Sequence, residues 1–557
     1  MKNKLIKILA IVLTIVLGTV GCTKENKDSN EEINEYNIQE SDYIHLTMLF
    51  PTTINPILNR DKSVGYIMNL IYDGLFEIDE NYNAEPRLVE EYTKSSDGKS
   101  INIKLKSDAI WHNNKEVTSS DVSFTVDLIK KTKDSPYIDL VENIKSIDIS
   151  DSNNFTINLN ENDPFIIDKL TFPVVSKDIL SSLKTDEVSQ YKYNLIGNGP
   201  YKIKEYEDRK YIILERNEDY FGDSPENRKK IFVKMVPDKE SQTEMVLALD
   251  SDIASISLAE LSKFEDKKEF NITKYEGRDY EMVIFNYNNE FLSNVNFRKA
   301  IISAINREKL LKEAYVDNAT LSHFPLNTTS KYYNKDIESL EYNKEKAIEY
   351  LTEALKSVNE SLEVQKQAKS SEQNSENLQG IIEDNSTDTL SNSELSKEDM
   401  KEILNQIELN IVVSAENNER IKVANVIKQN LASIGIKSVV KELNEKDLTT
   451  ALNSKEYDLA VVGYSLSSVP DARSIIEACN ITDNQLSTYI KSLGNSKSED
   501  ETKKIYDQIQ KYVVEKGSFI SLGILDNFIV SNKRLEGTIN PNDFDIYKGI
   551  SNLQMSK

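Results

Sequence analysis

The sequence predicts an α/β protein made of several lobes. Strand-like and helical patterns alternate from Glu408 onward, which is typical of a parallel sheet with helices on both faces. Residues 80–196 instead combine a helical pattern with alternating strands and a hairpin, which indicates a separate α/β segment. The length of 557 residues is enough for roughly three domains.

The chain begins with the three-part layout of a secretory signal. Lysines at positions 2, 4 and 7 precede an apolar stretch from Ile8 to Leu17, and small or neutral residues lead to Cys22. This apolar stretch is too short and wrongly flanked for a membrane span of the mature protein. The protein is therefore expected to work outside the cytoplasm.

Cys22 directly follows Gly21, which resembles a bacterial lipobox, in which the cysteine becomes the lipidated first residue of the mature protein. Thr19 stands where leucine is commoner. We expect residues 1–22 to be a lipoprotein signal peptide, with an uncleaved anchor or an ordinary signal peptide as alternatives. Residues 23–40 are polar and charged, which is typical of a flexible tether. Lipid is thus expected to hold the protein at the outer face of a cell membrane.

Composition excludes several function classes. The formal net charge of −24 argues against nucleic acid as a partner, because phosphates would be repelled. Cys479 is the only cysteine left once Cys22 carries lipid, so no disulfide within the chain is expected. His45, His112 and His323 lack the spacing of metal ligands, and neither a metal nor a cofactor is expected.

Local patterns predict the elements of residues 80–196. Residues 101–105 alternate between apolar and polar side chains after a turn at Asp97-Gly98, which predicts a half-buried strand. Thr118 to Asp121 have the pattern of a capping box at the start of a helix. The polar residues 151–154 separate two alternating segments, which predicts a hairpin.

The second half predicts strand, helix, strand, helix and strand. The first strand starts at Glu408, and a helix over Val423 to Leu431 is closed by Gly435. Two further strands are IKSVV and the continuous apolar run DLAVVG. Ligands of such sheets bind beyond the carboxyl ends of the strands, so the loop from Tyr464 to Pro470 is a favoured site.

A compositionally biased stretch interrupts this half. Lys356 to Met400 are rich in Ser, Asn, Gln and Glu and contain almost no aromatic residues. Such a segment buries too little apolar area to offset its ordering entropy. We expect a disordered or loosely helical surface insertion, with a charge-rich coiled segment as the alternative.

Several strings, in the same order along the chain, resemble the extracytoplasmic solute-binding proteins of family 5, which serve peptide and nickel ABC importers. These strings are Ile54-Asn55-Pro56, Tyr72 to Leu75, Trp111 to Asn114, Glu116 to Val122, Gly197 to Tyr201, Asn217 to Phe221, Phe285-Asn286, Phe297 to Ala300, Ala304 to Glu308 and Tyr342 to Leu351. Each string alone is weak, whereas the ordered set is specific. The resemblance runs from about residue 44 to residue 550.

The resemblance implies a periplasmic-binding-protein-like fold, in which two α/β lobes surround a ligand cleft and an extra lobe is attached. The implied boundaries are 41–79, 197–283 and 518–557 for lobe I, 80–196 for lobe II, and 284–517 for lobe III with its acidic insertion at 356–400.

The resemblance also implies a function. It implies a lipid-anchored, monomeric receptor of an ABC importer in a Gram-positive bacterium, which captures oligopeptides and delivers them to permease and ATPase subunits. A receptor for a nickel chelate or another small solute is one alternative, and a surface lipoprotein that senses peptides without transport is another. An enzyme is not expected, because Gly463 to Ser467 stop short of the G-x-S-x-G motif and Cys479 lies in a neutral stretch.

The candidate ligand-binding residues come from this resemblance. They are Arg60, Asp61 and Lys62 in an early loop, Tyr137, and Tyr464, Ser465, Leu466 and Ser467 after the last apolar strand. Solvated surface charges and a filler tyrosine are the alternative interpretations of the first four. Trp111, Arg298 and Asn306 are expected to be structural.

Peptide-binding relatives carry an aspartate in the last of these loops, where it binds the free α-amino group of the peptide. Here the expected acidic position falls on Leu466, Ser467 or Ser468, and Asp471 lies beyond Pro470. A buried ammonium without a carboxylate is costly. The sequence therefore predicts a blocked peptide, another small solute, or a peptide amine that pairs with Asp61 instead.

Overall fold

The computed structural model describes residues 43–181, 195–222, 229–375 and 397–556. The predicted signal peptide with Cys22 and the predicted tether lie outside the described residues, as do residues 376–396 of the predicted insertion. Among the helices of the described ranges, none combines the length and the apolar character that crossing a membrane requires.

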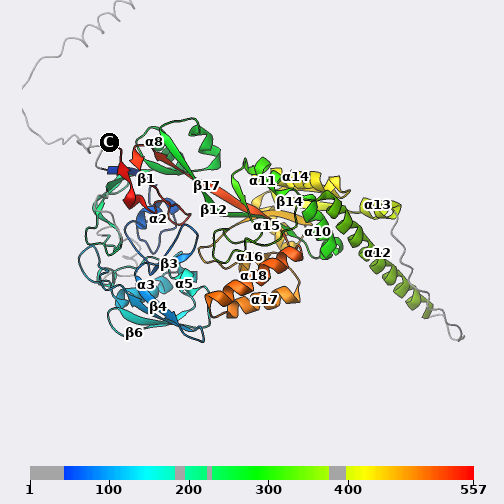
Figure 1. Ribbon diagram of the computed structural model, residues 1–557, viewed down its shortest axis with the longest axis horizontal. Helices are drawn as coiled ribbons and strands as arrows, with labels where there is room; N and C mark the ends of the chain where they lie inside the picture. Colours follow the sequence, from blue (N-terminus) through cyan, green and yellow to red (C-terminus); the bar gives the residue numbers. More distant parts are fainter. Residues whose placement is uncertain (1–42, 182–194, 223–228, 376–396, 557) are drawn as a thin grey trace, which may run out of the picture. The chain divides into compact units, whose positions relative to one another are not determined.

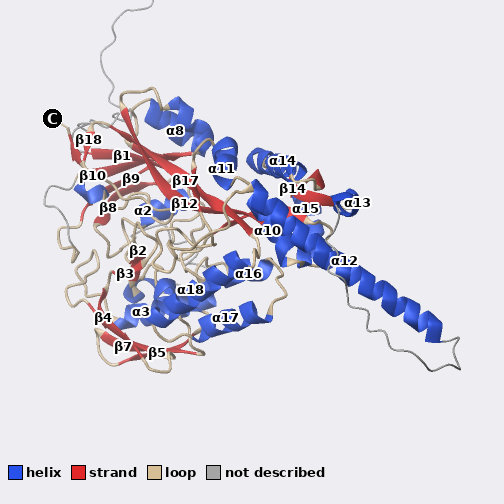
Figure 2. Cartoon of the chain, turned by 45° about the vertical axis from the view of Figure 1, so that its right-hand side comes forward, coloured by secondary structure: helices blue, strands red, loops and turns tan. Residues whose placement is uncertain are grey.

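The central sheet has seven strands within the described ranges, in the order β11-β17-β12-β16-β14-β15, and β13 pairs with β17 off this path. Its strands are β11 (Ile253–Ile256), β12 (Phe270–Phe285), β13 (Ala319–Leu321), β14 (Glu408–Ser414), β15 (Lys437–Leu443), β16 (Leu459–Ser465) and β17 (Ile520–Asn532). Figure 2 shows β12 and β17 side by side, and these two strands pair antiparallel from Phe270 to Val283 of β12.

The central sheet is mixed, which corrects the prediction of a parallel sheet. β14 runs parallel to both β15 and β16, as the alternation after Glu408 predicted. β16, however, pairs antiparallel with β12, from Asp279 to Phe285 of β12. The partner strand comes from a distant part of the chain, so no local pattern in β16 indicates its direction.

Four smaller sheets accompany the central sheet within the described ranges. Two have four strands, in the orders β1-β10-β9-β8 and β4-β5-β7-β6, and two have two strands, β2 with β3 and β18 with β19. Their strands are β1 (Tyr43–Leu49), β2 (Phe76–Ile78), β3 (Ala84–Pro86), β4 (Val89–Lys94), β5 (Ser100–Leu105), β6 (Ile144–Ile149), β7 (Asn154–Leu159), β8 (Tyr201–Glu207), β9 (Tyr211–Arg216), β10 (Lys230–Val236), β18 (Leu535–Glu536) and β19 (Gln554–Met555). The predicted strand at 101–105 and the predicted hairpin around 151–154 are confirmed.

Helices cover the sheets. They are α2 (Lys62–Met68), α3 (Ser119–Lys131), α4 (Ile138–Val141), α5 (Ile166–Lys169), α6 (Lys177–Leu180), α8 (Lys239–Leu247), α9 (Glu290–Ser293), α10 (Val295–Ala304), α11 (Arg307–Tyr315), α12 (Lys344–Ser375), α13 (Lys397–Asn405), α14 (Asn418–Ser433), α15 (Glu445–Ser454), α16 (Arg473–Ala478), α17 (Asn484–Asn495) and α18 (Glu499–Glu515). The predicted capping box is confirmed, because the Thr118 backbone N–H donates to the Asp121 carboxylate over 2.9 Å at the start of α3.

The predicted cover of helices on both faces of the parallel strands is confirmed. Leu459 and Val461 of β16 belong to a hydrophobic core that includes α14, whereas Ala460 and Val462 belong to a core that includes α16 and α18. Successive side chains of a strand point to opposite faces, so the two cores lie on opposite sides. Accordingly, α14 lies on one side of β14 and α16 and α18 on the other (Figure 1). Gly435, which was expected to close α14, has a positive φ of 90°.

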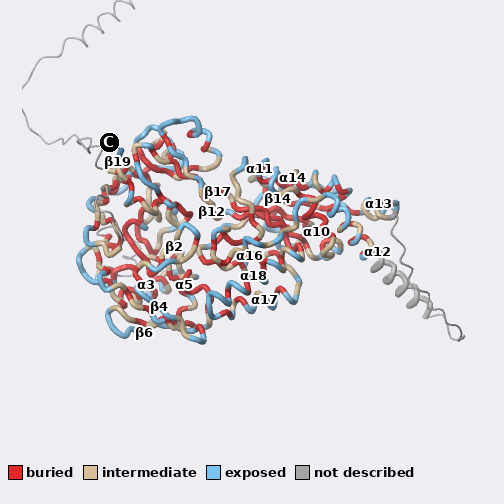
Figure 3. The backbone as a smooth tube through the Cα atoms, viewed as in Figure 1, coloured by how far each residue is buried: buried red, intermediate tan, exposed pale blue. Residues whose placement is uncertain are grey.

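Burial follows the same plan. Figure 3 shows the strands around β14 as a buried interior, with buried and exposed residues alternating along the helices on either side. β15 is the edge strand and is only partly buried, in an alternating pattern.

The long helix α12 overlaps the predicted insertion. Its first part packs through Ala347, Leu351 and Leu355, which recur at helical spacing and are buried. The helix continues from Lys356 to Ser375, so the described start of the insertion is helical. The predicted boundaries of the insertion and of the three lobes stay predictions.

Phe165 joins residues 80–196 to the helices of the second half. Its side chain is fully buried, and its ring packs edge-on against Tyr332 and near Tyr506, each at a centroid distance of 6.0 Å. The Asn162 side-chain amide donates to the backbone carbonyls of Gly494 and Ser496 over 3.1 and 3.0 Å. Two aromatic contacts and two hydrogen bonds thus help to hold this junction together.

Asp168 lies on α5, next to this junction, and is only 3% exposed. Its Oδ1 atom has no hydrogen-bond partner among the described residues. Burial raises the pKa of the Asp168 carboxyl to about 6, against the opposing effect of Lys331 and Lys94. An ionised carboxylate is therefore unfavourable at this position.

We expect Asp168→Asn to stabilise the protein more at pH 8 than at pH 4.5. Because the folded-state pKa is raised, the stability that the protonated carboxyl contributes is fully present below its unfolded pKa and is lost as pH rises through about 6. Asparagine removes this loss, so the gain in the free energy of unfolding at pH 8 should exceed the gain at pH 4.5 by about 2 kcal/mol. Urea unfolding at both pH values measures it, with the surface variant Glu90→Gln as control. An equal gain at both pH values would contradict the prediction.

Candidate functional site

Two pockets lie beside the middle of β12. The larger pocket has a volume of about 480 Å³ and is lined by Leu49, Asp61, Lys62, Ser63, Tyr66, Lys239, Gln242, Ala254 to Leu258, Tyr275, Asp279, Tyr315, Asn318, Leu525 to Asn527, Asp543, Ile546 and Tyr547. The loop pocket has a volume of about 160 Å³ and is lined by Tyr82, Pro325 to Asn327, Ser330, Tyr464 to Asp471, Ser474 and Ile475. The larger pocket falls within the usual range of small-molecule sites, about 300–1,000 Å³.

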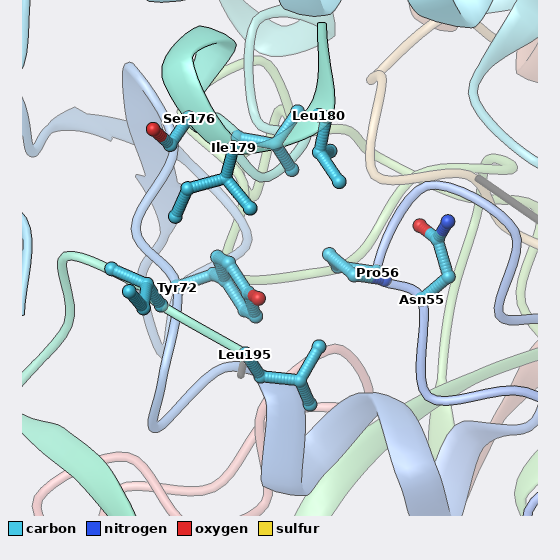
Figure 4. A pocket seen from close by; sticks show the side chains of 9 residues that line it. Asn55, Pro56, Tyr72, Ser176, Ile179, Leu180 and Leu195 are labelled. Atoms are coloured by element: carbon cyan, nitrogen blue, oxygen red, sulfur yellow. The ribbon is translucent and has the colours of Figure 1, made fainter. Parts of the chain in front are cut away.

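A third hollow is too small for a ligand. It lies between α6 and the loop that carries Asn55 and Pro56, and Figure 4 shows Tyr72, Ile179 and Leu195 pointing into it. These side chains leave about 10 Å³, which is about the room that one water needs.

The loop pocket forms where β16 ends. Tyr464 pairs with Tyr280 of β12, and its half-buried side chain packs against the core of the second half. Burial raises the pKa of the Tyr464 hydroxyl, so the hydroxyl stays neutral and can donate or accept a hydrogen bond. Leu466 is buried, and its backbone N–H donates to the Arg278 carbonyl over 2.8 Å. The Ser467 hydroxyl accepts from the Val469 backbone N–H over 3.1 Å, which closes a tight turn.

The one carboxylate that lines the loop pocket is already paired. Asp471 accepts from Arg473 Nε over 2.8 Å and from Nη2 over 2.5 Å, in a two-pronged contact. Such a pair is among the stronger hydrogen-bonded arrangements. The loop pocket therefore offers a ligand mainly neutral side chains and backbone groups.

The early loop has two different roles in the structure. Arg60 donates from Nε and Nη2 to the Asp134 backbone carbonyl over 3.2 and 3.0 Å, and it lines neither pocket. Asp61 caps α2 by accepting from the Val64 N–H over 3.1 Å. Asp61 and Lys62 both line the larger pocket.

Tyr137 also lines neither pocket. Its ring packs at 6.4 Å from that of Phe172, and burial raises the pKa of its hydroxyl to about 12. The neighbouring Ser135 hydroxyl donates to the Ile57 carbonyl over 2.8 Å, which ties this segment to the early loop. Ligand contacts of Arg60 and Tyr137 stay predictions.

Asp543 is a buried residue of the larger pocket with several polar partners, and the sequence analysis did not single it out. Its Oδ1 accepts from the Asn527 amide and from the Tyr275 hydroxyl, the latter over 3.3 Å. Its Oδ2 lies 3.4 Å from Arg278 Nε and 3.8 Å from Lys62 Nζ. A short acidic segment after the last long strand has no periodic or motif signal, so nothing in the sequence pointed to it.

Arg278 connects the two pockets. It sits in the part of β12 that departs from the β17 register, between Glu276 and Tyr280. Its guanidinium donates to the Leu466 carbonyl over 2.7 Å, on the loop-pocket side, and reaches Asp543 on the other side. The guanidinium also stacks 4.3 Å from the centre of the Phe544 ring. One side chain thus fixes the positions of both pocket walls.

Three residues have the structural roles that were expected of them: Trp111, Arg298 and Asn306. Trp111 is 2% exposed and belongs to the core of the first half. Arg298 is buried and donates to backbone carbonyls that include those of Gly517 and Lys516. Asn306 caps α11 by accepting from the Lys309 N–H over 2.9 Å. Cys479 is 1% exposed, and burial raises the pKa of its thiol, which disfavours the reactive thiolate.

The histidines occupy separate places. Burial lowers the pKa of His112 and of His323 to about 4 each, so both are neutral at pH 7. Across the described ranges, no three His, Cys, Asp or Glu side chains are grouped so that they could hold a metal ion.

The comparison with known proteins adds a family and a fold. The family model described as bacterial extracellular solute-binding proteins, family 5 Middle, matches residues 83–485. The oligopeptide-binding protein AppA of Bacillus subtilis is 23% identical over 550 residues, which cover 95% of this chain and 94% of that protein.

Two solved structures resemble the whole described body. The ABC transporter substrate-binding protein CtaP from Listeria monocytogenes has a TM-score of 0.71 at 21% identity, covering 92% of this chain and 99% of that one. NikZ from Campylobacter jejuni, in complex with Ni(L-His), has a TM-score of 0.61 at 21% identity, with coverage of 92% and 99%. At these identities the structures show a shared multi-lobed periplasmic-binding-protein fold, which confirms the predicted fold class.

We expect Arg278→Met to loosen both pocket walls together. Methionine keeps much of the apolar stem but leaves the Leu466 carbonyl without this donor and leaves the buried Asp543 carboxylate less compensated. The free energy of unfolding should fall by about 2–3 kcal/mol. Hydrogen exchange should become faster both in residues 464–471 and in residues 542–545.

The matched control is Lys263→Met, which breaks an exposed pair with Glu244 at 3.4 Å. Exposed pairs contribute about 0–1 kcal/mol, so this variant should change little. Faster exchange in only one of the two segments of Arg278→Met would argue against a connecting role.

Proposed function

Because the chain belongs to the bacterial extracellular solute-binding proteins of family 5, and so is a substrate-binding protein of the peptide and nickel type of ABC transporter, we propose that it captures oligopeptides. In this proposal lipid on Cys22 holds the protein at the outer face of the cell membrane, and the protein delivers its cargo to a permease. ATP is hydrolysed by separate subunits.

The observation that carries the proposal is the larger pocket of about 480 Å³ with the loop pocket beside it. Together the two pockets provide room for several consecutive residues of an extended chain. An extended peptide suits such a place, because its main-chain groups can be hydrogen-bonded whatever its side chains are. Hydrated space around the side chains then permits broad specificity.

The proposed contacts follow the lining of the pockets. Asp61 and Lys62 contact the ligand in the larger pocket, and Tyr464, Ser465, Leu466 and Ser467 contact it in the loop pocket. Ser255, Ser257 and Asn527, which also line the larger pocket, offer further hydrogen-bonding groups. The proposal does not rest on Arg60 and Tyr137.

Native mass spectrometry of protein purified without denaturation tests the proposed cargo. A peptide receptor should carry a set of added masses that fragment into amino-acid ladders. A single added mass with the isotope pattern of nickel would instead favour a receptor for a nickel chelate. A peptide-sensing lipoprotein without a transport role would carry peptides, but its deletion would leave peptide uptake unchanged.

We expect Tyr464→Ala to weaken peptide capture by about tenfold or more, because an aromatic side chain that a ligand buries contributes about 1.5–3 kcal/mol. Trp111→Phe, a change in the core away from both pockets, should leave capture unchanged after correction for stability. Capture from an equimolar synthetic hexapeptide library, quantified by mass spectrometry, measures both. Equal effects of the two substitutions would refute the placement of Tyr464 against the ligand.

We expect Cys22→Ala to release the protein from the membrane or to leave its signal peptide uncleaved. The reason is the lipobox-like stretch that ends in Gly21-Cys22. Each buried methylene of an acyl chain contributes about 0.8 kcal/mol, so two or more chains on Cys22 form a stable anchor. Cell fractionation and the intact mass of the mature protein measure the outcome. A mature wild-type protein that starts at an unmodified Cys22 would sink the proposed anchor.

A further inference from the structure

We propose that Asp543 binds a cationic nitrogen of the peptide, either the α-ammonium group or a lysine or arginine side chain. This inference rests on the proposed function and adds to it the charge of the cargo and the place where that charge is held. The loop pocket is a poor place for a cation, because its carboxylate, Asp471, is already held by Arg473.

The geometry of Asp543 leaves room for another donor. Its side chain is only 5% exposed, and its Oδ1 is held by Asn527 and Tyr275. The cations that face Oδ2, Arg278 at 3.4 Å and Lys62 at 3.8 Å, are farther away than the roughly 2.7–2.9 Å of a charge-assisted hydrogen bond. A ligand ammonium or guanidinium at ordinary distance would therefore improve the pairing of a buried carboxylate.

The walls around Asp543 suit a cation as well. The Tyr66 and Tyr547 rings meet edge to face at a centroid distance of 6.3 Å, and both residues line the larger pocket with Tyr275. The Tyr66 hydroxyl donates to the Asp543 backbone carbonyl over 3.2 Å, which fixes the ring beside the carboxylate. Aromatic faces attract cations, most strongly where water is excluded.

The charges of the larger pocket are unevenly held. Asp526 and Asp543 are buried and line the pocket, and Asp526 already has a close cation, because Lys274 Nζ lies 2.7 Å from its Oδ2. Lys62, by contrast, is 63% exposed, and among the described residues its ion pair is the long contact to Asp543 at 3.8 Å. We infer that Lys62 is a movable resident cation, which a cationic ligand displaces from Asp543 while the lysine stays at the edge of the larger pocket, beside the ligand.

Capture from a synthetic hexapeptide library tests the inference on the full mature chain. The library contains four matched classes: free or acetylated amino terminus, each with or without one lysine. Wild-type protein should enrich the class with both cationic groups, and at least one of the two singly charged classes, by about tenfold to a hundredfold over the acetylated class without lysine. The relative enrichment of the two singly charged classes distinguishes an α-ammonium site from a side-chain site.

Two substitutions should act in opposite directions. Asp543→Asn should abolish the enrichment of cationic peptides. Lys62→Ala should increase the enrichment of cationic peptides severalfold, because the cation that competes for Asp543 is gone. The Lys62 side chain is exposed, so this substitution should leave the fold intact. The matched controls are Glu90→Gln and Lys104→Ala, the two members of a surface pair at 3.0 Å outside both pockets, which should leave the enrichment unchanged.

The possible outcomes distinguish the binding of a cation by Asp543 from the proposed capture of peptides. Capture of all four classes to the same extent would overturn the inference and leave the peptide receptor standing. Capture of no class would overturn the proposed function, and the inference with it. If Asp543→Asn does not fold, Lys62→Ala decides alone, and an enrichment unchanged from wild type overturns the inference.

Discussion

The pairing of β12 with β17 is the constraint on which the rest of this structure depends. Both strands are long, and they run antiparallel from Phe270 to Val283 of β12 with a shift in register between Glu276 and Tyr280. Gly277 lies in that shift, where a Cβ atom would come within 2.7 Å of the Leu525 carbonyl. The shift brings Arg278 and Asp279 out of the β17 ladder, and this is where the two pockets meet the sheet.

Charge at this crossing explains why both pockets keep their form. Arg278 is 14% exposed and holds the Leu466 carbonyl, the Phe544 ring and the Asp543 carboxylate from one position. A guanidinium can do so because its donors are fixed in a planar fork, which a lysine lacks. The loop pocket has paired or neutral groups, and the larger pocket has a buried carboxylate that is loosely paired. The chemical difference between the two pockets is that Arg473 pairs closely with the carboxylate of the loop pocket, whereas Arg278 contacts that of the larger pocket only at 3.4 Å.

Much of the fold could be predicted from the sequence, because neighbouring residues decide it. The capping box at Thr118, the hairpin around 151–154 and the alternation after Glu408 each involve residues within a few positions of one another. The prediction of a parallel sheet holds for β14, β15 and β16, but it failed at the pairing of β16 with β12, which is antiparallel. That pairing joins segments that are distant in the sequence, and the residue pattern of a strand does not indicate which strand it pairs with.

The sequence by itself determined the elements, the hydrophobic faces and, through family resemblance, the early loop and the loop after β16 as candidate sites. Only the tertiary structure decided that Asp61 and Lys62 line one pocket while Tyr464 to Ser467 line another. It alone brought Asp543 to Arg278, across a separation of 265 residues. The physical reason is that periodicity and capping are local, whereas the partner of a buried charge is set by how distant segments pack.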